Sequence, residues 1–189
     1  MNTKDFTLLD KVLANYRLSV VSKYIKKNEV ILDIGCGVQH YLLSRFKHKF
    51  SLGYGLDYDV KDCQQGNVRL VNYKYQGSLP LNDNLFDKVF LVAVLEHIEE
   101  HNVQSLFLEF FRILKKHGRI IITSPTPRSK PFLEFIALKL KLVAAEEVTD
   151  HKHYYLAEEI RDLAEKSGLR MIEARYFQLG LNCLYILEK

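Results

Sequence analysis

The feature of this sequence that most constrains its fold is an apolar run that leads into a glycine loop. Residues 30–34 read Val-Ile-Leu-Asp-Ile, and Gly35, Cys36 and Gly37 follow directly. A nearly continuous apolar run is typical of a strand buried on both faces of a parallel sheet. Two glycines one residue apart permit a tight turn into a helix, whose first amides can face a ligand. The stretch therefore predicts an α/β protein with a binding site at this loop.

The rest of the chain alternates between apolar runs and helical spacings. Strands are expected at 50–56, 68–73, 88–93 and 119–123, and helices at 5–27, 41–46, 102–114, 132–143 and 156–163. Lys115–Gly118 is expected to form a basic helix end and a turn. Alternation of this kind predicts a doubly wound parallel sheet with right-handed crossovers. Residues 169–177 and 182–187 predict two closing strands, which the short turn at Gly180 makes antiparallel.

Length, charge and cysteine content restrict the class of protein. The 189 residues are expected to form one domain, and the net charge of +4 is too small for a nucleic-acid binder. No apolar run reaches the length of a membrane span, and no signal peptide is evident. Cys36, Cys63 and Cys183 show neither metal-site nor disulfide spacing, which favours a reducing cytoplasm. Cys36 is expected to be a packing residue rather than a nucleophile.

Two acids are placed to bind a cofactor beside the loop. A dinucleotide fingerprint requires a third glycine where this chain has His40, so nicotinamide and flavin dinucleotides are disfavoured. Asp57 ends the second expected strand, where a carboxylate can accept both hydroxyls of a ribose. Asp33 can accept from a cationic amine or orient the loop amides. The structural alternative is an ordinary turn capped by Asp33, with Asp57 facing solvent. The two acids together favour a nucleoside-bearing cofactor.

A family resemblance is carried by four segments in chain order: VILDIGCG, GYGLDYD, LPLNDNLFDKVFLVAVLEHI and RILKKHGRIIITSPTP. Together they resemble the class I S-adenosylmethionine-dependent methyltransferases of the small type 11 kind. The resemblance extends over residues 30–187. It implies one Rossmann-like domain, with helices on both faces of a seven-stranded, mostly parallel sheet whose last strand is antiparallel. The implied activity is methyl transfer from S-adenosylmethionine, which becomes S-adenosylhomocysteine, to a small or lipid-linked acceptor.

The resemblance also implies which residues bind the cofactor. Asp33 would lie near its aminoacyl end, Asp57 on the ribose hydroxyls and Tyr58 beside the adenine. Leu91 would offer a carbonyl to the methionine amine, and His97 would face the cofactor. The full set of expected contacts is Asp33, Gly35, Cys36, Gly37, Asp57, Tyr58, Gly77, Ser78, Leu79, Leu91 and His97.

Two further segments are expected to complete the site. Residues 1–28 would form a helical cap, whose Tyr16 and Arg17 fold over the cofactor carboxylate, and residues 124–155 would be an insertion that covers the substrate. Expected substrate contacts are Arg128, His153 and Tyr154, and candidates for a general base are His97, His151, His153 and Tyr154. A homo-oligomer is left open. So is a non-catalytic protein that binds the cofactor or activates a partner methyltransferase.

The sequence departs from the family pattern at two places. Gln39 stands where the family usually has glycine, and a positive φ would be unfavourable for glutamine there. No aspartate stands near Tyr75 or Gln76 to hold the adenine amine, a contact that a backbone amide or Ser78 could replace. A weakened cofactor site is therefore an alternative that the sequence leaves open.

Overall fold

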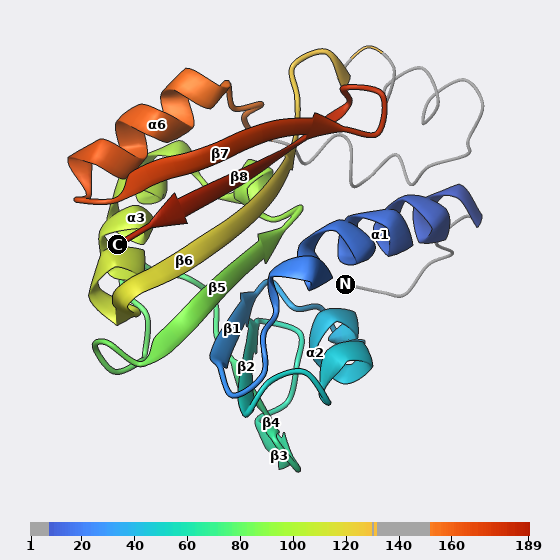
Figure 1. Ribbon diagram of the computed structural model, residues 1–189, viewed down its shortest axis with the longest axis vertical. Helices are drawn as coiled ribbons and strands as arrows, with labels where there is room; N and C mark the ends of the chain where they lie inside the picture. The colour runs from blue at the N-terminus through green and yellow to red at the C-terminus, as the bar shows by residue number, and fades with distance from the viewer. Residues whose placement is uncertain (1–7, 130, 132–151) are drawn as a thin grey trace.

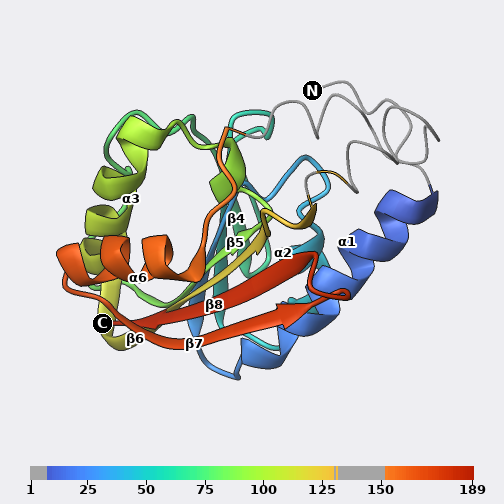
Figure 2. The same ribbon diagram turned by 90° about the horizontal axis from the view of Figure 1, so that it is seen from above.

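The protein forms three layers in the computed structural model, which describes residues 8–129, 131 and 152–189. Its helical elements are α1 (Leu8–Val21), η1 (Ser22–Tyr24), α2 (Tyr41–Phe46), η2 (Leu95–His97), α3 (Glu100–Ile113) and α6 (Ala157–Lys166). Its strands are β1 (Val30–Ile34), β2 (Leu52–Asp57), β3 (Cys63–Gln65), β4 (Val68–Asn72), β5 (Phe86–Val92), β6 (Leu114–Pro125), β7 (Arg170–Phe177) and β8 (Asn182–Glu188). One face of the sheet carries α1 and α2, and the other carries α3 and α6 (Figures 1 and 2).

The strands form a single sheet in the order β3-β4-β2-β1-β5-β6-β8-β7. The strands from β4 to β6 are parallel, and β8 runs antiparallel to both of its neighbours. This confirms the predicted fold class. The sheet has eight strands rather than seven, because β3 pairs with β4 as a short antiparallel hairpin. Gly66 closes that hairpin with a φ of +60°, a conformation that glycine adopts without strain.

The core lies on both faces of the sheet, which explains why β1 is apolar apart from Asp33. Leu32 and Ile34 belong to the apolar cluster that includes the buried residues of α3 and α6. Ile31 belongs to the other cluster, which includes Leu18 of α1 and Leu42 of α2. Successive side chains of a strand point to opposite faces, so Asp33 shares a face with Ile31. The acid therefore lies on the side of the sheet that α1 and α2 cover.

Asp87 and Lys115, which lie in the third and fourth segments that carry the family resemblance, stabilise the sheet rather than bind a ligand. The Asp87 carboxylate accepts from the backbone N–H of Val30 at 2.8 Å and from Lys115 at 2.7 Å. It thus ties the start of β5 to the start of β1 and to β6. Burial tends to raise the pKa of this carboxyl, but those hydrogen bonds prevail and hold it below its ordinary value. The aspartate after Phe86 is therefore a structural residue.

A second support holds the turn between β4 and β5 against α3. The Arg112 guanidinium donates to the carbonyl oxygens of Leu79 and Leu81 and to Asp83, at 2.6–3.0 Å. Glu109 accepts from Arg112 and, at 2.6 Å, from the backbone N–H of Leu79. The hydrogen bond to Arg112 lowers the pKa of Glu109, so the pair stays charged. We call this arrangement the Glu109–Arg112 clamp.

Several expected elements differ from those observed. Lys115–Gly118, expected as a turn, is included in β6, although the register shifts there and His117 has a φ of +62°. The helix expected at 132–143 lies outside the described residues. No helix in the parts of the chain that the structure describes is long and apolar enough to cross a membrane.

Candidate functional site

The carboxyl ends of β1 and β5 meet α1 and α2 around a cavity of about 130 Å³. Ligands of open α/β sheets bind at such carboxyl ends, where the strand order reverses. In this sheet the reversal lies between β1 and β5. The cavity is lined by Ala14, Arg17, Leu18, Asp33, Gly35, Cys36, Tyr41, Leu42 and Val92. The structure therefore brings together Asp33, the start of the glycine loop and Arg17 of the N-terminal helix.

Both glycines of the loop adopt left-handed conformations, with φ of +68° at Gly35 and +69° at Gly37. A Cβ atom on Gly35 would lie 2.5 Å from a methyl carbon of Val94, so only glycine allows the loop to approach the end of β5. A Cβ on Gly37 would meet nothing within 4 Å. The first glycine is thus required for packing, whereas the second faces open space that a ligand can occupy.

The Asp57 carboxylate fixes the glycine loop from the end of β2. Its Oδ2 accepts from the backbone N–H of Gly37 at 2.9 Å, and its Oδ1 accepts from that of Asp59 at 2.9 Å. The backbone N–H of Gly35 donates to the Leu56 carbonyl at 2.8 Å. A carboxylate offers about four acceptor positions, so Asp57 keeps capacity for the hydroxyls of a ligand. The orientation of this carboxylate is set before any ligand binds.

Asp33 is a buried acid at the wall of the cavity, with 4% of its surface exposed. Burial, helped by the nearby charge of Asp57, raises the pKa of its carboxyl to about 8. An acid of this kind is neutral at low pH and gains a charge when a cationic group approaches. Strongly shifted acids in a cavity are typical of binding and catalytic sites.

The Cys36 side chain is a packing group, as the sequence predicts. Its sulfur would lie 2.8 Å from a Cβ atom on Gly55, so it rests against the bare backbone of β2. Burial is the main cause that raises the pKa of the Cys36 thiol, and the charges of Asp33 and Asp57 act in the same direction. The thiol stays protonated and is a poor nucleophile.

The positive φ considered for Gln39, the departure from the family pattern that lies in the glycine loop, occurs instead at the next residue. Gln39 is not among the residues with positive φ, so glutamine causes no left-handed strain there. His40 instead has a φ of +34° and precedes α2. Its backbone N–H donates to the Gly37 carbonyl at 3.0 Å, and its carbonyl accepts from Ser44 at 2.9 Å. The loop therefore enters α2 through the position where a dinucleotide fingerprint has its third glycine.

Of the expected cofactor contacts, Asp33, Gly35 and Cys36 line the cavity, and the others, Gly37, Asp57 and His97 included, are not among its lining residues. Tyr58 is 54% exposed directly after β2. Gly77 has a φ of +96°, and the carbonyl oxygen of Ser78 accepts from the hydroxyl of Tyr73. The Leu79 amide is already bound by the Glu109–Arg112 clamp, and its side chain is buried. Leu91 lies inside β5, whereas Val92 is the residue of this strand that reaches the cavity.

The residues expected to contact substrate are spread over several surfaces. Arg128 is exposed just after β6, and Tyr154 is half-buried. His153 is held by two carboxylates: Nδ1 lies 3.0 Å from Glu100 and Nε2 lies 2.9 Å from Glu159. These contacts tie residues 152–156 to α3 and α6. His151 lies outside the described residues.

Sequence reasoning missed one buried acid at this edge of the sheet. Glu96, in η2 between Leu95 and His97, is 1% exposed, and one carboxylate oxygen accepts from the Ser124 hydroxyl at 3.3 Å. Its signal in the sequence is its place in the segment LPLNDNLFDKVFLVAVLEHI, three residues after the strand expected at 88–93, and that place does not indicate that the side chain is buried. Burial of Glu96 depends on β6 and on residues far along the chain.

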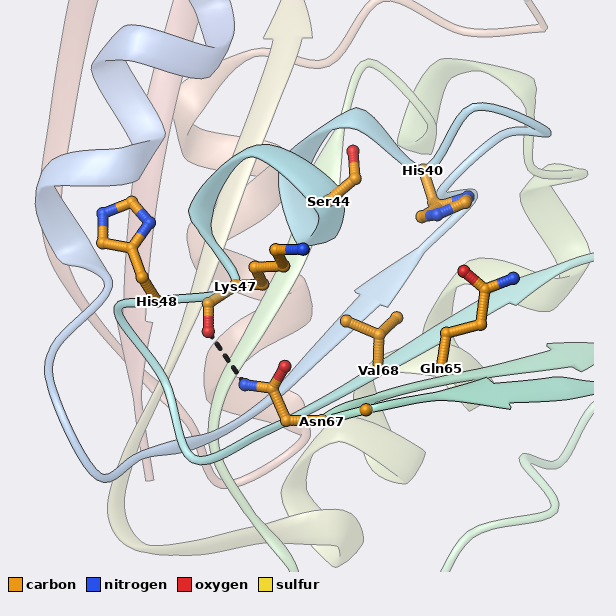
Figure 3. Close-up of a pocket in the computed structure, with 8 residues that line it drawn as sticks. His40, Ser44, Lys47, His48, Gln65, Asn67 and Val68 are labelled. Atoms are coloured by element: carbon orange, nitrogen blue, oxygen red, sulfur yellow. Dashed lines mark hydrogen bonds between the residues drawn. The ribbon is translucent and has the colours of Figure 1, made fainter.

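A larger hollow of about 510 Å³ lies between α2 and the β3–β4 hairpin. Figure 3 shows its lining residues, with the Asn67 amide donating to the Lys47 carbonyl at 2.8 Å. None of the expected site residues lines it, and Val68 is its one buried side chain. We place the functional site at the smaller cavity, because the buried acid and the glycine loop are there.

Comparisons with known proteins agree with the fold described above. A family model described as a methyltransferase domain matches residues 7–174. The ubiquinone/menaquinone biosynthesis C-methyltransferase UbiE of Desulfotalea psychrophila is 27% identical over 154 residues, which are 74% of this chain and 56% of that protein. The chain therefore spans little more than half of the length of this curated relative.

Two solved structures have the same fold at low sequence identity. An S-adenosylmethionine-dependent methyltransferase from Archaeoglobus fulgidus is 19% identical with a TM-score of 0.70, and the match covers 95% of this chain and 94% of that one. A Haloferax volcanii methyltransferase in complex with the methyltransferase activator Trm112 is 13% identical with a TM-score of 0.67, covering 98% and 99%.

The sheet order and the glycine loop, with these comparisons, define the class I S-adenosylmethionine-dependent methyltransferase fold. Since the family model matches most of the sequence, the chain belongs to the family of methyltransferase domains. The resemblance inferred from four sequence segments is confirmed.

Proposed function

We propose that this chain transfers a methyl group from S-adenosylmethionine to a small or lipid-linked acceptor. The observation that carries the proposal is the pair of carboxylates, Asp33 and Asp57, on either side of a glycine loop whose second glycine faces open space. When bound, S-adenosylmethionine supplies a methyl group activated by a sulfonium. The task left to the protein is to bind, orient and exclude water.

The residues at the cavity fit the polar groups of this cofactor. Asp33 would accept from its cationic amine, and Arg17, which lines the same cavity, would bind its carboxylate. Asp57 would accept from the ribose hydroxyls. Gly37 leaves room for the cofactor because it has no side chain. The amine and the carboxylate of the cofactor thus each have a partner of opposite charge.

The acceptor class is supported by the relative rather than by the cavity. UbiE is by its name a C-methyltransferase of ubiquinone and menaquinone biosynthesis. A small or lipid-linked acceptor for this chain agrees with that name. The substrate contacts remain the predicted Arg128, His153 and Tyr154. Residues 1–28 remain a predicted helical cap over the cofactor, and residues 124–155 remain a predicted insertion that covers the substrate.

The proposal is tested in two stages with purified protein. Calorimetry with S-adenosylmethionine and S-adenosylhomocysteine measures cofactor binding, with NAD as the control ligand. Transfer of a radioactive methyl label into small-molecule and lipid fractions of cell extracts then measures activity. Failure to bind either cofactor, or tighter binding of NAD, contradicts the proposal. Cofactor binding without transfer to any fraction favours the non-catalytic alternative. The Haloferax methyltransferase in complex with an activator is the reason for testing that alternative.

Cofactor affinity is expected to rise with pH between pH 6 and 7.5. Asp33, with a pKa of about 8, is mostly protonated in this range, and the bound cationic amine favours its ionised form. Binding therefore releases about one proton, and affinity increases by up to about tenfold per pH unit. Calorimetry in buffers of different ionisation enthalpy measures both quantities. Asp33→Asn should bind more weakly and without pH dependence. An affinity that is constant or falls over this range contradicts the assignment of Asp33.

A further inference from the structure

The site has a second half that the proposed cofactor contacts leave unused. Asp33 and Asp57 stand at the ends of β1 and β2, on one side of the point where the strand order reverses. On the other side, Glu96 follows β5 and Ser124 lies near the end of β6. Because the carboxyl ends of parallel strands meet at one edge, these residues lie at the same edge of the sheet as the proposed cofactor contacts.

Glu96 is held firmly at this edge. Its side chain accepts from the Ser124 hydroxyl at 3.3 Å, and its backbone carbonyl accepts from the N–H of Lys152 at 2.7 Å. Glu96 is 1% exposed and Ser124 is fully buried. Burying a carboxylate disfavours folding by several kcal/mol unless hydrogen bonds and nearby cations offset it, and at Glu96 burial outweighs them, since the pKa of its carboxyl is raised. A carboxyl kept here against that cost indicates a role in binding or catalysis.

Groups from several elements act on Glu96. Burial raises the pKa of Glu96, whereas a backbone hydrogen bond, the nearby cations His97 and Arg17 and the Ser124 hydroxyl lower it. Tyr155, on the segment before α6, is 5% exposed, and its hydroxyl has no hydrogen-bond partner within the described part of the chain. Burial and the charges of Glu100, Glu159 and Glu96 raise the pKa of Tyr155 to about 12, so this hydroxyl stays a donor.

Arg17 connects the two halves of the site. It lines the cavity together with Asp33, and its charge also acts on Glu96. A group bound between Asp33 and Glu96 would thus lie beside a fixed cation, which favours negative charge that develops there. This arrangement suits an acceptor that loses a proton as it is methylated.

We propose that Glu96 is the general base that takes the proton of the methyl acceptor. The inference rests on the proposed methyl transfer. The acceptor forms a bond to the methyl carbon as the bond from that carbon to sulfur breaks, and the electron pair of the broken bond stays on sulfur. The proton that the acceptor loses passes to an oxygen of the Glu96 carboxylate. Ser124 is a positioning residue, because its hydroxyl orients that carboxylate.

The test compares Glu96→Gln with the wild type and with Glu99→Gln, a matched change of an exposed neighbouring acid. Calorimetry with S-adenosylmethionine should give the same affinity for all three proteins. Label transfer into the extract fraction that the wild type methylates should be about 100-fold slower or more in Glu96→Gln alone. The wild-type rate should rise with pH as Glu96 ionises and then level off, and this rise should be absent in Glu96→Gln. Melting curves check that each variant is folded.

Two further variants separate a base from a structural residue. Glu96→Asp keeps a carboxylate and should retain the pH-dependent rise at a reduced rate. Ser124→Ala removes a donor that stabilises the charged form, so the rise should move to higher pH. Equal rates in Glu96→Gln and the wild type, or a slower variant with an unchanged pH profile, would overturn the role of Glu96. A wild type that binds cofactor but methylates no fraction overturns the proposed function itself, and this inference with it.

Discussion

Replacement of Asp57 by alanine is expected to weaken S-adenosylmethionine binding by roughly 100-fold or more. The substitution removes the proposed acceptor of both ribose hydroxyls, and hydrogen bonds to a charged group contribute about 1.5–3 kcal/mol each. It also leaves the Gly37 N–H without the acceptor that fixes the loop. Calorimetry at constant pH measures the change in affinity.

Asp162→Ala is the control, because Asp162 is an exposed acid on α6 and the substitution changes the net charge equally. This variant should bind the cofactor like the wild type. Melting temperatures measured without ligand separate a loss of binding from a loss of folding. If folded Asp57→Ala binds within about threefold of the wild type, the ribose assignment is wrong.

Alanine at the two loop glycines is expected to have different effects on stability. Gly35→Ala should lower the free energy of unfolding by about 2–5 kcal/mol, since a left-handed alanine is strained and its Cβ would lie 2.5 Å from Val94. Gly37→Ala should cost only the backbone strain, about 1–2 kcal/mol, because its Cβ meets nothing. Urea unfolding of both variants measures the difference.

Cofactor affinity should be reduced in Gly37→Ala, the variant that loses less stability. The Cβ of Gly37→Ala points into the space proposed for the cofactor, so this variant should be folded but bind weakly. Gly35→Ala with Val94→Ala should regain part of its stability, because the shorter side chain relieves the contact. Equal stability of the two single variants would show that the Val94 contact does not limit the loop.

The fold was predictable because its strongest signal is local. A strand buried on both faces is apolar at nearly every position, as β1 is apart from Asp33, and β1 occupies the predicted residues 30–34. The hairpin of β3 was not predictable, since its three residues, Cys63–Gln65, have no apolar pattern of their own. Lys115–Gly118 carries the charges and glycine of a turn, and although it is included in β6, the pairing with β5 passes from Leu114 directly to Arg119 with a shift in register. The local preference for a turn is thus retained as an irregularity within the strand, with a φ of +62° at His117.

The candidate site was predictable only where it follows a strand directly. Asp33 and Asp57 are fixed by the ends of β1 and β2, so their place could be deduced from strand boundaries alone. The contacts of Glu96 could not, because it accepts hydrogen bonds from Ser124 and Lys152, which are distant in sequence. The positive φ of His40 could not be predicted either, since neither Gln39 nor His40 is a residue type that marks which of the two adopts it.

The Glu109–Arg112 clamp has a consequence for how such chains change over evolutionary time. Its residues belong to, or hold, two of the segments by which the family is recognised, yet they bind the turn between β4 and β5 rather than any reacting group. Selection for folding alone would preserve these segments. A descendant that had become a pseudoenzyme would therefore keep these two segments long after Asp33 and Asp57, in the other two, had been replaced.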